Sequence, residues 1–123
     1  MTKTPKTEQV HIEIETIASA MLDKKAQRVC AMDLRKPGAS ICDHFVICNA
    51  DSSTQVAAIA DNVEEMMWTV YTRKPRCSQG KENAFWVIID YFDIVVHIFL
   101  SEYRSFYRLE ELWADADTKH FNQ

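Results

Sequence analysis

Glycine is scarce in this sequence, with only Gly38 and Gly80 among 123 residues. A phosphate-binding loop and a dinucleotide-binding fingerprint each need several glycines in a fixed pattern, so both are excluded. The hydrolase pattern GxSxG and the zinc-protease pattern HExxH are also absent. No apolar run approaches the roughly 20 residues that a membrane-spanning helix needs. These absences argue against the commonest nucleotide-binding and hydrolytic enzymes and against a membrane protein.

Metal-binding patterns are scarce as well. The four cysteines, Cys30, Cys42, Cys48 and Cys77, include no CxxC pair, and Cys42 with His44 lacks a second pair to complete a tetrahedral site. Two-metal catalysis needs carboxylates that project together. The acid-x-acid pairs occur only in the first predicted helix, where they point apart, and near the C-terminus. We therefore expect no metal and no cofactor.

Charge is divided unevenly along the chain. Residues 1–81 carry 11 Lys and Arg against 10 Asp and Glu, whereas residues 82–123 carry 3 against 8. Phosphate backbones are bound by clustered Lys and Arg, so this distribution predicts little direct nucleic-acid binding. The acidic C-terminal third favours a basic protein as partner. Surplus acid that only keeps the domain soluble remains an alternative.

Two amphipathic helices are predicted from the apolar spacing. The first begins at Thr7 and ends near Asp23. The second follows Ser52, with Gln55 three residues later as in a capping box, and runs to about Thr72. The apolar positions of the two helices are Val10, Ile14, Ile17 and Met21, then Val56, Ile59, Ala60, Val63, Met67 and Val70.

Four strands are predicted from apolar runs bounded by turn residues. Residues 28–34 and 43–49 flank a Lys-Pro-Gly turn and predict an antiparallel hairpin, and residues 85–89 and 94–100 predict a tighter one. Together with the helices they indicate a single α/β domain over residues 7–116, with a mixed sheet of roughly four to five strands and helices on its faces.

The two ends of the chain are polar. Residues 1–6 predict a disordered N-terminal tail, and residues 117–123 predict a flexible C-terminal tail. The first residues contain no apolar segment of the secretory type, so we expect a cytoplasmic location.

The second hairpin carries the most informative side chains. Trp86 begins a strand, and it is either a core residue or an interface anchor beside charged residues. Asp90 and Asp93 belong to the turn, where they satisfy their own backbone or serve as charge partners. His97 lies inside an apolar run, and such a His more often has a structural role, bonded to backbone or to a carboxylate such as Asp90 or Asp93.

A helical segment with charged and aromatic side chains follows this hairpin. Arg104, Tyr107, Glu110 and Trp113 recur along one helical side. An exposed, salt-bridged helix would explain the charges but not the aromatic residues. The residues alone therefore favour an interaction module over an enzyme.

The block WVIIDYFDIVVHIF, followed by R.FY.LEELW, resembles the signature of the Iojap-related family, the ribosomal silencing factors. The resemblance covers roughly residues 10–115 and includes the segments 23–26, 43–47 and 53–61. Phe92 departs from the family pattern, because a glycine usually occupies this turn position. If the turn requires a positive φ, Phe92 is strained.

This resemblance implies a fold related to nucleotidyltransferases but without their catalytic carboxylates. It also implies binding to the large ribosomal subunit through large-subunit ribosomal protein fourteen. The bound factor would keep the small subunit from joining and so repress translation, and organellar relatives act in large-subunit assembly. Under this interpretation no catalysis is needed.

The resemblance and the charge pattern together give a site hypothesis. Trp86 would anchor the interface, with Asp90 and Asp93 as charge partners. Arg104, Tyr107 and Glu110 would orient or extend the surface. The alternatives are a nucleotide-binding or transferase-like protein that uses the helix start at residues 52–55, a large-subunit assembly factor, and a homodimer that uses the same surface.

Overall fold

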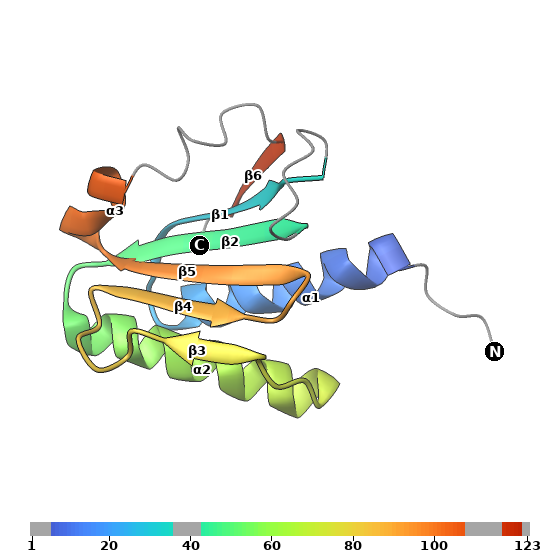
Figure 1. Ribbon diagram of the computed structural model, residues 1–123, viewed down its shortest axis with the longest axis horizontal. Helices are drawn as coiled ribbons and strands as arrows, with labels where there is room; N and C mark the ends of the chain where they lie inside the picture. The colour runs from blue at the N-terminus through green and yellow to red at the C-terminus, as the bar shows by residue number, and fades with distance from the viewer. Residues whose placement is uncertain (1–5, 36–42, 108–116, 122–123) are drawn as a thin grey trace.

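Six strands form one mixed sheet in the computed structural model, which describes residues 6–35, 43–107 and 117–121 (Figure 1). The strands are β1 (Gln27–Asp33), β2 (His44–Ala50), β3 (Cys77–Gln79), β4 (Trp86–Asp90), β5 (Ile94–Leu100) and β6 (Asp117–Phe121). Their order across the sheet is β3-β4-β5-β2-β1-β6. The central pair β2 and β5 is parallel, and the other neighbours are antiparallel. The predicted mixed α/β sheet is confirmed, with six strands in place of four to five.

The C-terminal residues correct one prediction. Residues 117–123 are predicted as a flexible tail, but Asp117–Phe121 form strand β6 and pair with β1 from Val29 to Asp33. The strand is an exposed edge, so its side chains carry no buried apolar pattern that the sequence could reveal. The folded domain therefore extends beyond residue 116.

Three helices accompany the sheet: α1 (Lys6–Asp23), α2 (Ser53–Tyr71) and α3 (Ser101–Tyr107). The predicted N-cap of α2 is confirmed, since the Ser52 hydroxyl accepts a bond from the Gln55 backbone N–H at 3.1 Å. The Gln55 side chain does not complete a capping box. It donates instead to the carbonyls of Lys24 and Lys25, each at 3.0 Å, and so fixes the chain between α1 and β1.

Helices α1 and α2 cover the same face of the sheet (Figure 1). The predicted apolar positions of both helices are buried there, with the exception of Val70, which is 52% exposed. The two helices are joined by polar contacts as well, including a bond from the Asn62 amide to the Ala20 carbonyl at 2.8 Å. The opposite face has no helix of comparable length among the described residues, and α3 lies at one end of it (Figure 1).

The β4–β5 hairpin turns over residues Tyr91 to Asp93 with a strained residue at its tip. The Asp90 carboxylate accepts the Phe92 backbone N–H at 2.8 Å, and Tyr91 N–H donates to Ile94 O at 2.8 Å. Phe92 has a φ of +81°, so the positive φ that a glycine would adopt freely is taken here by a bulky residue. Phe92 is 69% exposed, and its ring centroid lies 5.0 Å from the Arg76 guanidinium carbon.

This strain predicts an unusual response to substitution at Phe92. A Phe92→Gly variant is expected to be more stable than Phe92→Ala by about 1 kcal/mol, because alanine keeps the Cβ that disfavours positive φ. Both variants lose the ring, so their difference isolates the backbone effect. Urea denaturation of the two variants measures it, and an alanine variant as stable as the glycine variant would show that the turn is unstrained.

Candidate functional site

The predicted anchor Trp86 lies on the sheet face opposite α1 and α2. Alternate residues of β4 project to this face, so Trp86, Ile88 and Asp90 share it, and all three are half-buried. Their antiparallel neighbours on β5 are Phe99, His97 and Val95. A second apolar cluster is centred on this face. It contains Cys30, Met32, Leu34, Phe45, Ile47, Val95 and Phe99, with Trp86, Ile88 and Tyr103 packed against it.

The Trp86 indole is fixed by two contacts to β5. Its ring stacks on Phe99, with the ring centroids 5.3 Å apart and the planes 23° from parallel. Its Nε1–H donates to Nδ1 of His97 at 3.1 Å. Trp86 is thus neither a fully buried core residue nor a freely rotating surface residue. A large aromatic ring held in one orientation on a half-open face is typical of an interface anchor.

His97 has a different partner from the expected one. The sequence favours backbone or a carboxylate such as Asp90 or Asp93, but the structure pairs the imidazole with the Trp86 indole. The residue of β4 directly opposite His97 is Ile88, not an aspartate. Burial without a neighbouring charge lowers the pKa of His97 to about 4, so the ring is neutral at pH 7.

This lowered pKa predicts acid sensitivity. The pKa of His97 is about 4 in the folded state, whereas the ordinary value is 6.5. The unfolding free energy therefore has its full value above pH 6.5 and decreases as the pH falls toward 4. A lowering of this size corresponds to about 3 kcal/mol of unfolding free energy at pH 4. Urea denaturation at a series of pH values should show a steeper loss for the wild-type protein than for His97→Phe. Equal slopes would contradict the assignment.

The turn aspartates are paired within the protein. Asp90 binds the Arg76 guanidinium at 2.7 Å, and its pKa is lowered, since the Arg76 and Phe92 bonds outweigh the opposing effect of burial. Asp93 forms an ion pair with Arg73, which also binds Glu13 of α1 and the Tyr91 carbonyl. In the folded protein, Arg73 and Arg76 therefore neutralise part of the acidic charge of the C-terminal third. The two aspartates do not form an unpaired acidic surface.

Arg104 is not a surface residue. The side chain is predicted to orient or extend the interface surface, but it is 2% exposed and lies between α3 and the sheet. Its guanidinium donates to the Arg28 carbonyl at 2.6 Å and to Asn49 Oδ1 at 2.9 Å. The strand register shifts between Gln27 and Cys30, and the Arg28 carbonyl lies at this bulge. Arg104 therefore has a structural role that fastens α3 to β1 and β2.

The remaining predicted contacts are only partly visible. Tyr107 is the last residue of α3, while Glu110 and Trp113 lie outside the described residues. Sequence reasoning missed Ile88, which the period-two spacing from Trp86 indicates. It also missed the pair of Phe85 and Tyr103, whose ring centroids are 5.1 Å apart beside α3. We define the docking face as Trp86, Ile88, Asp90 and this aromatic pair.

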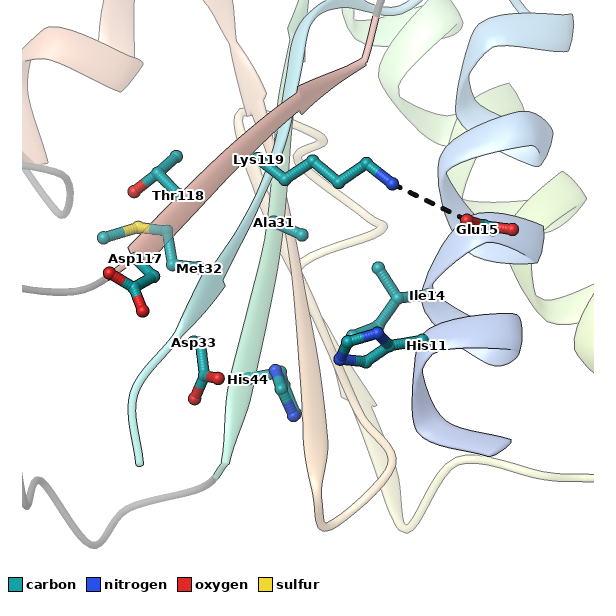
Figure 2. Close-up of a pocket in the computed structure, with 10 residues that line it drawn as sticks. All are labelled: His11, Ile14, Glu15, Ala31, Met32, Asp33, His44, Asp117, Thr118 and Lys119. Carbon is teal, nitrogen blue, oxygen red and sulfur yellow. Dashed lines mark ion pairs between the residues drawn. The ribbon is translucent and has the colours of Figure 1, made fainter. Parts of the chain in front are cut away.

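A separate cavity of about 300 Å³ opens between α1, the end of β1, the start of β2 and β6 (Figure 2). Its floor includes Ile14, Ala31 and Met32, and its polar lining includes the imidazoles of His11 and His44. Burial lowers the pKa of His44, which favours its neutral form. The cavity thus lies on the helical side of the sheet and is distinct from the docking face.

The charges of this cavity disfavour phosphate. Three carboxylates line it, those of Glu15, Asp33 and Asp117, and the single lysine, Lys119, is paired with Glu15 at 3.6 Å (Figure 2). The side-chain bond from Arg35 lowers the pKa of Asp33 to about 2, so this carboxylate is ionised at any ordinary pH. A nucleotide phosphate would meet net negative charge here.

The start of α2, which the nucleotide-binding alternative would use, is also unsuited to an anion. Asp51 stands beside the helix start, where its carboxylate accepts bonds from the Ser101 hydroxyl at 2.7 Å and the Gln27 amide at 2.9 Å. These bonds lower the pKa of Asp51, so the position already carries negative charge. The Ser52 hydroxyl is used as the N-cap. A phosphate approaching this helix would be repelled.

Within residues 6–35, 43–107 and 117–121, no three His, Cys, Asp or Glu side chains are grouped so as to hold a metal ion. None of the helices in those ranges combines the length and apolar character required to cross a membrane.

Comparisons with known proteins agree on one family. Residues 6–123 match the family model described as "Ribosomal silencing factor during starvation". The ribosomal silencing factor RsfS of Halalkalibacterium halodurans is 40% identical over 106 residues, which cover 85% of this chain and 88% of that protein. A crystal structure of a Chromobacterium violaceum protein superposes with a TM-score of 0.80 at 28% identity, covering 85% of this chain and 86% of that one.

A more distant relative carries a related name. "Mitochondrial assembly of ribosomal large subunit protein 1" of Mus musculus is 27% identical over 103 residues. The match covers 82% of this chain and 45% of the mouse protein, so the chain spans about half the length of that relative.

Proposed function

Since this chain belongs to the family of ribosomal silencing factors, we propose that it binds the large ribosomal subunit in the cytoplasm and represses translation without catalysis. The bound protein would occupy space that the small subunit needs, so subunit joining would be blocked sterically. The observation that best supports this proposal is the oriented Trp86 on the docking face, because a fixed aromatic anchor is a feature of binding surfaces.

The proposed contact on the ribosome is a basic protein at the intersubunit face, large-subunit ribosomal protein fourteen. Trp86 and Ile88 would supply the apolar centre of the interface. Asp90 lies at the same face and is bound by Arg76, whose side chain is more than half exposed. A basic partner residue would compete with Arg76 for this carboxylate, so Asp90 is the charge contact we propose. The Asp93 side chain is exposed to a similar extent, but its cation Arg73 is less exposed than Arg76 and also binds Glu13 and the Tyr91 carbonyl, so we expect a partner to displace it less readily.

Sedimentation through a sucrose gradient tests this function directly. The purified protein is mixed with separated large or small subunits and located by immunoblotting. It is expected to migrate with large subunits and to stay at the top of the gradient with small ones. Protein that remains at the top with large subunits would refute the proposed function.

A nucleotide-binding protein is the competing class, and the acidic surroundings of both candidate anion sites disfavour it. A thermal-shift screen with nucleotides and divalent metals separates the two. A ligand present at 100 times its dissociation constant would stabilise the protein by roughly 2.7 kcal/mol. We expect no shift, and a shift with any nucleotide would restore the alternative.

The name of the mouse relative supports a second role, in assembly of the large subunit. Silencing and assembly make different predictions in a cell that lacks the protein. Loss of a silencing factor leaves the large subunits complete, whereas loss of an assembly factor causes immature particles to accumulate.

A second copy of this chain would be another occupant of the same docking face, and light scattering of the purified protein would detect that homodimer.

A further inference from the structure

The bond between Trp86 and His97 fixes the protonation of the imidazole. The indole Nε1–H is a donor only, so Nδ1 of His97 must accept and carry no proton. The ring proton therefore sits on Nε2. Neutral His97 is also the form that its deep burial favours, since the side chain is 5% exposed. The contact thus requires one protonation state and one tautomer.

Packing alone does not explain a histidine at this position. The imidazole lies among aromatic rings, edge-on to Phe45 at 4.5 Å between centroids and nearly parallel to Phe99 at 6.2 Å. Its Nε2 is buried and has no hydrogen-bond partner within the part of the chain that the structure describes. A buried polar group without a partner costs about 1 to 3 kcal/mol, so phenylalanine would fill the same space at lower cost. What histidine adds there is the acceptor for Trp86.

We propose that His97 is a positioning residue, which holds the Trp86 indole in the orientation that meets the large-subunit partner. This inference rests on the proposed function and assigns a specific task to a buried residue that would not itself contact the partner. Phe99 fixes the plane of the indole by stacking, and His97 fixes its rotation within that plane through Nε1. An anchor that is already oriented loses less side-chain entropy when it binds.

The test removes and then restores the acceptor. His97→Phe keeps an aromatic ring but offers no acceptor, whereas His97→Asn places a carbonyl oxygen near the position of Nδ1. His97→Phe is expected to weaken binding to purified large subunits roughly fivefold, the equivalent of one lost hydrogen bond. His97→Asn is expected to bind within about twofold of wild type by the same reasoning. Amide spectra of both variants confirm that each is folded at the temperature of the binding measurement.

A second measurement follows the contact itself. In the wild-type protein, long-range ¹H–¹⁵N spectra should show His97 protonated at Nε2, and the Trp86 indole proton should exchange slowly with water. In His97→Phe the indole proton should exchange faster, and in His97→Asn the protection should return. An indole proton with equal protection in all three proteins would overturn the inference, as would equal loss of binding in both variants.

The binding results also separate this inference from the proposed function. If Trp86→Ala loses binding while His97→Phe binds as wild type does, the docking face stands and the positioning role is wrong. If Trp86→Ala binds as wild type does, the docking face itself is wrong, and the role of His97 falls with it.

Discussion

An Arg73→Ala variant is expected to lose about 3 kcal/mol of unfolding free energy, the lower end of the usual range for removing one partner of a buried ion pair, because Arg73 itself is partly exposed. Arg73 binds the carboxylates of Glu13 and Asp93 and donates to the Tyr91 carbonyl at 2.6 Å. It therefore joins α1, the exit of α2 and the β4–β5 turn. Glu13 is 6% exposed, so removing Arg73 leaves a buried carboxylate without its cation. Urea denaturation at pH 7 measures the loss.

Arg76 provides a matched control three residues away. It has the same side chain and pairs with the neighbouring hairpin carboxylate of Asp90, but it is well exposed to solvent. Arg76→Ala should cost clearly less than Arg73→Ala, because the Arg76 guanidinium is more than half exposed and water can replace it beside Asp90. Adding Glu13→Gln to Arg73→Ala should recover part of the loss, since an amide is easier to bury than a carboxylate. Equal losses in the two alanine variants would contradict a buried role for Arg73.

A Trp86→Ala variant is expected to bind large subunits at least about 30-fold more weakly, the equivalent of about 2 kcal/mol for an interface hot spot. The indole supplies the largest ring of the docking face and is already oriented by Phe99 and His97. Because the side chain is only half-buried, its removal should leave the fold intact. Binding of labelled protein to purified large subunits measures the loss.

Trp68 is the control for this prediction. It is 48% exposed on α2, on the helical side of the sheet, and the Lys74 ammonium lies 5.2 Å from its ring. Trp68→Ala removes an equally large ring from a surface outside the docking face. Its binding to large subunits should match that of wild type. A loss from Trp68→Ala as large as that from Trp86→Ala would place the contact elsewhere.

The sequence predicts the core of the fold well because buried apolar runs carry their own signal. Residues 94–100 are predicted as a strand with the bounds that β5 has, and the N-cap at Ser52 is likewise as predicted. The two edge strands were not predicted. β3 has three exposed residues, and β6 is exposed along nearly all its length, so each is defined by pairing with a neighbour and not by its own pattern.

The site was predicted less completely than the fold. Trp86 is predicted as an interface anchor, and this role stays a prediction. The structure places it half-buried on the sheet face opposite α1 and α2, and the neighbours that fix it are known only once β4 and β5 are paired. The ion pairs of Asp90 and Asp93 could not be predicted from the turn itself, because their partners, Arg76 and Arg73, come from another part of the chain. Arg104 fits a surface helix by its spacing, yet a bulge in β1 offers it a backbone carbonyl, that of Arg28. Such long-range pairings leave no trace in local sequence.

A subunit-joining assay tests whether this protein acts by occupying a surface of the large subunit through Trp86. Light scattering follows association of purified large and small subunits after preincubation of the large subunits with the protein. We expect wild-type protein to suppress association in proportion to its occupancy of large subunits, and we expect no suppression from an equal concentration of Trp86→Ala. If the two subunits associate to the same extent while wild-type protein is bound to the large subunits, this mode of action is wrong.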